Sequence, residues 1–157
     1  MMEIFVSIGD FKIAKGHAVL KSVGLGSCVG VALYDFVNRI GALSHVMLPK
    51  SPNGVKRSAK YADHAIEMML ESMERVGAER ENVIAKIAGG AQVFKHVTID
   101  NLKIGDRNVE AVKEQLKLFK IKLVSEDTGG TFGRSIYFFT SNGRMLVKYS
   151  NGRELWI

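Results

Sequence analysis

Two hydrophobic patterns alternate along the chain, and their order constrains the fold more than any other feature. Residues 2–48 hold apolar runs rich in β-branched and aromatic residues, broken by glycine turns, which predicts short strands. Residues 62–76 and about 106–119 instead repeat apolar side chains at the spacing of an amphipathic helix, and Gly77 marks a stop after the first. The last third returns to strand patterns, with Asn142-Gly143 as a strong signal for a two-residue hairpin turn. Strands at both ends with helices between them favour an α+β domain over a regular doubly wound sheet.

The length of 157 residues is about the size of one domain. Pro49 and Pro52 flank the polar stretch 50–58, which is the only segment with the composition of a mobile loop and which we interpret as a loop within a domain rather than a linker. We therefore predict a single domain over residues 1–157. No apolar run approaches the ~20 residues of a membrane-spanning helix, and the N-terminus lacks the pattern of a secretory signal. These features predict a cytoplasmic protein without membrane insertion.

The chain has one cysteine, Cys28. A single thiol cannot form an internal disulfide or a multi-thiolate zinc site, so it acts alone or with other residue types. Cys28 lies at the start of the clearest hairpin, in which apolar runs over residues 29–34 and 40–48 flank a loop over residues 35–39.

The predicted hairpin places a histidine near this cysteine. If the loop is centred near Phe36 and Val37, antiparallel pairing puts Cys28 opposite His45 or an immediate neighbour, with Cβ atoms ~5 Å apart. A thiol and an imidazole at that distance are a usable nucleophile and base. A register slip of one residue would turn the two side chains to opposite faces of the sheet, so this prediction depends on the loop.

Hydroxyl groups near the pair suggest a third member. Ser22 lies just upstream of the cysteine and could hydrogen-bond the far ring nitrogen of His45 to fix its tautomer. Ser44 is less attractive, because the neighbour of His45 on a strand points to the other face.

The glycine turn Gly24-Leu25-Gly26-Ser27-Cys28 precedes the hairpin. It does not fit a phosphate-binding loop, because its glycine spacing is wrong and a strand rather than a helix follows it. Its backbone N–H groups, at Gly26, Ser27 and Cys28, need not be paired in a sheet and could hold an anion that develops beside the thiol.

Simpler structural interpretations remain open for these residues. A lone cysteine is more often a small buried hydrophobe than a catalyst, and His45 could be a core histidine with one satisfied hydrogen bond. We expect His17, His64 and His96 to be exposed, and their wide spacing predicts no metal site. Gly89-Gly90 and Gly129-Gly130 indicate turns, although the segment from Asp127 to Gly130 could also line a pocket.

The net charge of +6 favours an anionic partner, which could be nucleic acid, a membrane surface or an acidic protein. The basic residues are spread along the chain without an aromatic-rich basic strand, so nucleic acid is the least favoured partner. The local cluster of Lys56-Arg57 with Lys60 predicts a solvated loop, with an acidic partner as the lesser alternative.

Six short motifs occur in order along nearly the whole chain and together resemble the CheD family, the chemoreceptor glutamine deamidases. They are Gly24-Leu25-Gly26-Ser27-Cys28-Val29, Ser44-His45-Val46-Met47-Leu48-Pro49, Tyr61-Ala62-Asp63, Lys86-Ile87-Ala88-Gly89-Gly90-Ala91, Ile104-Gly105-Asp106-Arg107-Asn108 and Asp127-Thr128-Gly129-Gly130. With the strand and helix patterns, this resemblance predicts a single-domain layered sandwich of mostly antiparallel or mixed sheet with two main helices. It also implies a fold similar to the catalytic domain of the cytotoxic necrotizing factor toxins.

The resemblance implies an activity and residues to perform it. The family deamidates glutamines on the cytoplasmic helices of chemoreceptors, the methyl-accepting chemotaxis proteins, with a cysteine and a histidine that match Cys28 and His45. Ser22 stands where the family typically has threonine. The implied reaction passes through a thioester on the cysteine and needs no metal or organic cofactor.

The resemblance also implies a binding partner, CheC, a phosphatase that acts on phosphorylated CheY. This leaves an alternative function open. The protein could be a non-catalytic binding module that docks CheC or a receptor and regulates the phosphatase activity on CheY.

Overall fold

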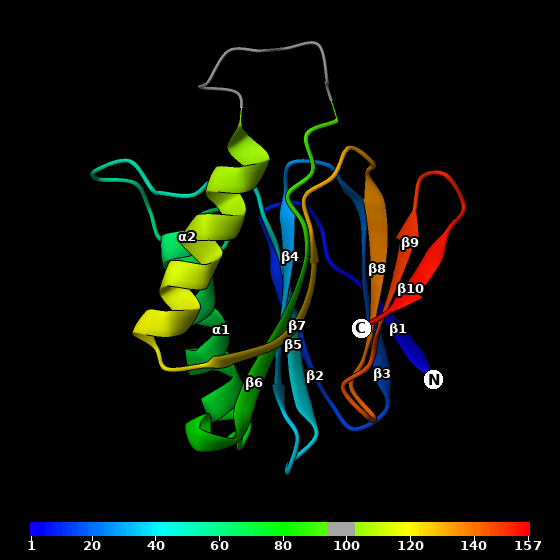
Figure 1. Ribbon diagram of the computed structural model, residues 1–157. Coiled ribbons are helices and arrows are strands. Elements are labelled where there is room, and N and C mark those ends of the chain that lie inside the picture. The colour runs from blue at the N-terminus through cyan, green and yellow to red at the C-terminus, as the bar shows by residue number, and fades with distance from the viewer. Residues whose placement is uncertain (94–102) are drawn as a thin grey trace.

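Two five-stranded sheets stack face to face in the computed structural model, which describes residues 1–93 and 103–157, and two helices cover the outer face of one sheet (Figure 1). Sheet A has the order β1-β3-β8-β9-β10 and consists of β1 (Met2–Phe5), β3 (Ala18–Leu25), β8 (Arg134–Phe139), β9 (Met145–Tyr149) and β10 (Glu154–Trp156). Sheet B has the order β2-β5-β4-β6-β7 and consists of β2 (Phe11–Lys15), β5 (Ile40–Val46), β4 (Val29–Asp35), β6 (Val83–Gly89) and β7 (Lys122–Thr128). The helices are α1 (Ala62–Arg75) and α2 (Ile104–Leu118), with a short 3-10 helix, η1 (Arg80–Asn82), before β6.

The α+β class, the two main helices and the layered arrangement agree with the sequence prediction. The sheets are mixed, because β1 pairs with β3 and β6 pairs with β7 in parallel, whereas the other pairs of neighbouring strands are antiparallel. Sheet B is the middle layer, between the helices and sheet A (Figure 1).

The position of sheet B explains why β4 and β5 are continuous apolar runs rather than alternating ones. Every residue of both strands is buried, since one face packs on the helices and the other on sheet A. On β4, Val29 and Val31 join the core beneath the helices, whereas Ala32 and Tyr34 join the core between the sheets. Successive side chains therefore enter two different cores.

The helices also follow the predicted periodicity. α1 buries one apolar stripe against sheet B, which consists of Ala62, Ala65, Ile66, Met69, Leu70 and Met73. α2 begins at Ile104, two residues before the predicted start, and its first turn lies against the end of β6. A Cβ built on Gly105 would lie 2.5 Å from the carbonyl oxygen of Gly90, so only glycine permits this approach.

Two connections differ in detail from the prediction. The β8–β9 hairpin forms at Asn142-Gly143, but residues 140–144 separate its strands, and Arg144 N–H bonds the Asn142 side chain at 3.0 Å. The predicted two-residue turn is therefore wrong, although the hairpin is confirmed. The stretch 50–58 is irregular, as expected, and is fastened to α1 because Ser51 bonds Asp63.

Candidate active site

Ser22, Cys28 and His45 lie at the same end of the sandwich, in the layer between the two sheets. Ser22 lies on β3 of sheet A, His45 is the second-last residue of β5, and Cys28 immediately precedes β4. Cys28 packs against the core between the sheets, and His45 lies on the same face of β5 as Leu43, which belongs to that core. Ser22 and His45 are fully buried, whereas Cys28 is partly exposed. The structure thus places Cys28 and His45 on one face of sheet B and Ser22 on the strand of sheet A that faces them.

The predicted hairpin register is wrong by two residues. Asp35 pairs with Ile40, so the loop has four residues, and Gly30 rather than Cys28 lies directly opposite His45. The Asp35 carboxylate accepts hydrogen bonds from backbone N–H groups of the next turn, which centres the loop later in the chain. Because side chains alternate, a shift of two residues preserves the face, and Cys28 stays on the side of His45.

The hydrogen bonds around Ser22 fix the tautomer of His45. Ser22 Oγ lies 2.8 Å from His45 Nδ1 and 2.8 Å from the carbonyl oxygen of Val6. A carbonyl only accepts, so the single hydroxyl proton of Ser22 goes to Val6, and Ser22 must accept the proton of Nδ1. His45 Nε2 then carries a lone pair, and it is buried with no hydrogen-bond partner among the residues described. The ring is arranged as a base with its basic nitrogen free.

Both members of the pair are neutral near neutral pH. Burial lowers the pKa of His45 from its ordinary value of 6.5 to about 4. Burial also raises the pKa of the Cys28 thiol. The resting state is therefore a thiol beside a neutral imidazole rather than a thiolate–imidazolium pair. Such a pair can act only if the histidine removes the thiol proton as the sulfur attacks.

Hydrogen bonds to its carbonyl groups stabilise the turn before β4. The carbonyl of Gly26 accepts from Ala91 N–H at 2.8 Å, and that of Cys28 accepts from Gly90 N–H at 2.8 Å. The prediction of a free N–H is wrong for Gly26, because its N–H donates to the Gly24 carbonyl at 3.1 Å within the turn. Gly89 has a φ of 121°, and a Cβ built there would lie 2.3 Å from the Cys28 carbonyl oxygen. The glycine pair at the end of β6, predicted to form a turn, therefore also lets the chain pack tightly against the nucleophile segment.

Asn108 on α2 holds the remaining carbonyl of the turn. Its side chain is fully buried, and Nδ2 donates to the carbonyl oxygens of Ser27 at 3.0 Å and Met47 at 2.9 Å. Sequence reasoning included Asn108 in a family motif but assigned it no role. Its contacts lie 81 and 61 residues away, so no local pattern could have revealed them.

Arg134 stabilises a second loop near the site, and it was not predicted from the sequence. It is buried, forms an ion pair with Asp127 at 3.0 Å, and donates to the carbonyl groups of Gly129 and Phe132. The loop that it holds bonds the end of β6, because Gly129 N–H donates to the Gly89 carbonyl at 2.9 Å. This loop also lines a small pocket of about 130 Å³, as one of the two sequence interpretations allowed.

The other residues singled out in the sequence lie away from this site or make structural contacts. His17 is exposed, as predicted, but the prediction for His64 is wrong, because its ring is partly buried and accepts a hydrogen bond from Ser58 N–H at 3.1 Å. His96 lies outside the described residues. Arg57 pairs with Glu67 and Glu71 on α1, as expected of a solvated charge cluster. Within residues 1–93 and 103–157, no group of three or more His, Cys, Asp or Glu side chains could hold a metal ion, and no helix there is long and apolar enough to cross a membrane.

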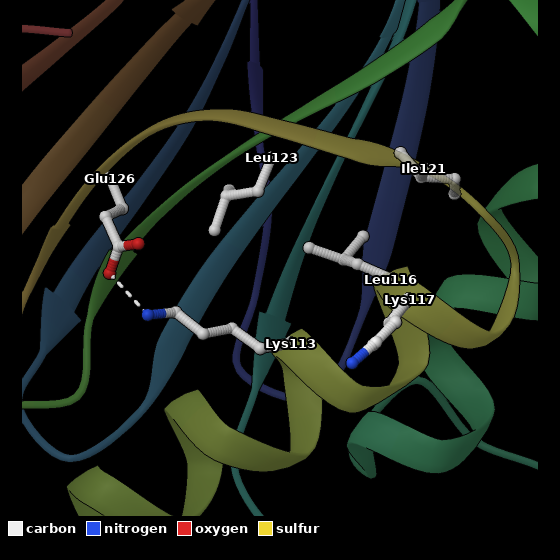
Figure 2. Close-up of a pocket in the computed structure, with 6 residues that line it drawn as sticks. All are labelled: Lys113, Leu116, Lys117, Ile121, Leu123 and Glu126. Atoms are coloured by element: carbon white, nitrogen blue, oxygen red, sulfur yellow. Dashed lines mark ion pairs between the residues drawn. The ribbon is translucent and has the colours of Figure 1, made fainter.

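A separate pocket of about 290 Å³ opens between α2 and β7, and none of the three candidates lines it (Figure 2). Its apolar walls come from Leu116, Ile121 and Leu123. Lys113 and Glu126 form an ion pair across its mouth at 2.9 Å. Its lining includes no cysteine, serine, threonine or histidine, so we place no chemistry there.

Comparison with known proteins identifies the family of the chain. The family model described as CheD chemotactic sensory transduction matches residues 47–149. A protein of Archaeoglobus fulgidus named probable chemoreceptor glutamine deamidase CheD is 65% identical over 155 residues, which are 99% of this chain and 98% of that protein. A Thermotoga maritima protein named chemoreceptor glutamine deamidase CheD is 43% identical over 153 residues, 98% of this chain and 96% of its own.

These names describe enzymes, amide hydrolases that act on protein glutamine. A relative in Methanosarcina acetivorans with a similar name is 47% identical, and 99% of this chain covers 69% of that longer protein. These alignments extend over the N-terminal strands, which lie outside the part that the family model matches. The family match over most of the chain and the high identity along nearly its whole length together show that the chain belongs to the CheD family.

Proposed function

We propose that this protein is a chemoreceptor glutamine deamidase, which hydrolyses receptor glutamine side chains to glutamate and ammonia in chemotaxis adaptation. The observation that carries the proposal is the hydrogen bond between Ser22 and His45. It leaves Nε2 of His45 free on the face of sheet B that also holds Cys28. The names of the relatives supply the substrate class.

The first half-reaction forms a thioester. His45 Nε2 takes the proton of Cys28 as the sulfur attacks the side-chain carbonyl carbon of the glutamine. The negative charge moves to the carbonyl oxygen, where the N–H groups of Ser27 and Cys28 stabilise it. His45 then returns its proton from Nε2 to the leaving nitrogen, the carbon–nitrogen bond breaks, and ammonia departs.

The second half-reaction regenerates the enzyme. His45 Nε2 removes a proton from water, and the oxygen attacks the thioester carbonyl carbon. The carbon–sulfur bond breaks, the sulfur takes the proton back from Nε2, and glutamate leaves. These steps balance with one water consumed and one ammonia released, and they need no metal or organic cofactor.

Ser22 supports both halves through the histidine. When His45 carries two protons, its Nδ1–H still donates to Ser22, whose own proton is directed to Val6. The buried imidazolium therefore keeps one hydrogen bond throughout. A threonine here, which the family resemblance leads us to expect, would supply the same hydroxyl with a more restricted rotamer.

Several further expectations belong to the same proposal. The protein acts as a single domain over residues 1–157, is cytoplasmic, and meets the cytoplasmic helices of chemoreceptors. It binds CheC as a partner and does not act on nucleic acid. Its fold resembles the catalytic domain of the cytotoxic necrotizing factor toxins.

The direct test is mass spectrometry of purified chemoreceptor cytoplasmic fragments before and after incubation with the protein, with released ammonia measured in parallel. We expect the wild type to convert individual glutamines to glutamates and to release equal amounts of ammonia. Cys28→Ala should abolish both signals while its thermal unfolding stays close to that of the wild type. Full activity of Cys28→Ala would refute the thioester mechanism.

A non-catalytic binding module is the second candidate, because burial raises the pKa of Cys28 and keeps the thiol protonated at rest. Iodoacetamide separates the two functions. A catalytic Cys28 should be alkylated faster in the wild type than in His45→Gln, since Nε2 assists the loss of the proton. Equal, slow alkylation in both proteins would favour the binding module.

A further inference from the structure

Asn108 connects the segment that carries the nucleophile to the segment that carries the base. Its Nδ2 group uses both protons, one for the Ser27 carbonyl and one for the Met47 carbonyl. Ser27 immediately precedes Cys28, and Met47 is two residues beyond His45. One buried amide of α2 therefore fixes the spacing of both segments at the open end of the β4–β5 hairpin.

The bond to Ser27 also sets the direction of the next N–H group. The C=O and N–H groups of a trans peptide lie in one plane and point in opposite directions. Because Asn108 holds the Ser27 C=O toward α2, the Cys28 N–H points away from α2. In the same way, Ala91 N–H holds the Gly26 C=O, so the Ser27 N–H points away from the end of β6.

Both N–H groups are available for a ligand. Neither Ser27 N–H nor Cys28 N–H donates a backbone hydrogen bond within the part of the chain that the structure describes. Backbone donors fixed in advance stabilise a developing oxyanion without reorganisation during the reaction. The direction of each N–H therefore depends on the hydrogen bond that the carbonyl of the same peptide group accepts.

We propose that Asn108 is a positioning residue that aims the Cys28 N–H at the oxyanion of the deamidation reaction. This inference rests on the proposed thioester mechanism, and it adds a residue of α2 that touches neither substrate nor sulfur. Without Asn108, the Ser27–Cys28 peptide loses its fixed acceptor bond and can rotate about the flanking dihedrals. The donor then no longer points consistently at the oxyanion.

The amide is needed here for its donors rather than for its volume. Asn108 Oδ1 is buried and has no partner among the described residues, so the amide carries an uncompensated desolvation cost. A leucine of similar shape would fill the space without that cost, but it would leave the Ser27 and Met47 carbonyls unpaired. The two carbonyls explain why a polar side chain fits this position.

The test compares two reactions of the same thiol. Deamidation passes through an oxyanion, whereas alkylation by iodoacetamide does not. For Asn108→Ala we expect kcat for deamidation of a receptor fragment to fall about 10²-fold with little change in KM. The rate of Cys28 alkylation should stay within about twofold of the wild type. If the alanine variant folds poorly, Asn108→Leu, which retains the side-chain volume, takes its place, and we expect the same two results.

A matched control separates this effect from general destabilisation. Thr140 is another buried polar residue, and its hydroxyl donates to the Gly16 carbonyl at 2.7 Å and accepts from Ala18 N–H at 3.0 Å at the opposite end of the sandwich. Thr140→Val should lower the unfolding temperature while leaving kcat unchanged.

Three results would overturn the inference. One is unchanged kcat in both Asn108 variants, and another is a parallel fall in deamidation and alkylation. If the wild type released no ammonia, the proposed function would fail and the role of Asn108 with it. An active wild type with unaffected Asn108 variants would refute only the role of Asn108.

Discussion

The two ends of the sandwich hold buried polar groups in different ways. At the end with the β4–β5 loop, Asp35 accepts from Val37 N–H, from the backbone and side chain of Asn38, and from Glu79 N–H. Burial alone would raise the pKa of Asp35, but these hydrogen bonds outweigh it and lower the pKa. The Asp35 carboxylate therefore uses its oxygens to stabilise the turns at this end.

At the other end, buried polar groups keep unused hydrogen-bonding capacity. His45 Nε2, Asn108 Oδ1 and Arg134 Nε are all buried without partners in the described part of the chain. Buried polar groups are usually satisfied, so such atoms call for an explanation. A base needs a free lone pair, which accounts for His45. The buried carboxylate at one end therefore has its hydrogen bonds satisfied, whereas the other end keeps an unpaired basic nitrogen. We call the end with Asp35 the closed end and the end with His45 the open end.

The largest expected effect comes from removing the base at the open end. His45→Gln retains a polar side chain of similar reach but cannot accept a proton at neutral pH. We expect deamidation of a receptor fragment to fall about 10²- to 10⁴-fold, as for loss of a general base. Steady-state ammonia release measures this, and activity within tenfold of the wild type would show that both ends of the sandwich are merely structural.

Removing the hydroxyl that orients the base should have a smaller effect. Ser22→Ala deletes the acceptor for Nδ1–H, so the ring can adopt the other tautomer and the imidazolium loses a partner. A hydrogen bond to a charged group is worth about 1.5–3 kcal/mol, which predicts a fall in kcat of about 10- to 100-fold. Ser22→Thr should retain activity. Equal losses in both variants would point to packing rather than to the hydroxyl.

Acid should destabilise the open end through His45. Its pKa is about 4 in the folded protein against 6.5 ordinarily, so between these values the unfolded chain binds more protons. Stability is therefore full above about pH 6.5 and falls as the pH drops toward 4, by about 3 kcal/mol in total. Denaturant unfolding across this range should show the loss in the wild type and a smaller one in His45→Gln. Identical acid slopes would mean that His45 is not protected from protonation.

Changes at the closed end should alter stability and leave catalysis alone. Asp35→Ala removes four accepted hydrogen bonds and leaves their donors to water or unpaired, which should cost about 1–3 kcal/mol or more of unfolding free energy. Well below its unfolding temperature, this variant should deamidate at the wild-type rate. A lower kcat in the folded variant would show that the two ends are coupled.

The sequence predicted those features that depend on local pattern. The apolar runs of β4 and β5 and the stripe of α1 each reflect burial of one short segment, and their positions are confirmed. The face shared by Cys28 and His45 was also predicted, because alternation tolerates an even shift in register. The register itself was not, since it depends on how the Asp35 carboxylate builds the loop.

Most contacts between distant elements could not be predicted from pattern alone. The hydrogen bond between Ser22 and His45 is the exception: it was suggested by the position of Ser22 and is confirmed, although the pattern does not indicate how sheet A and sheet B stack to form it. Asn108 and Arg134 donate hydrogen bonds to backbone carbonyls. Every residue has such a carbonyl, so the sequence does not indicate which ones they bind. Only the assembled fold identifies them.

The state of the His45 ring is the most direct test of this account. Nitrogen NMR of protein labelled at histidine reports which ring nitrogen carries the proton. We expect a neutral ring near neutral pH, with the proton on Nδ1 and none on Nε2, and loss of that preference in Ser22→Ala. A proton on Nε2, or a doubly protonated ring at neutral pH, would contradict it.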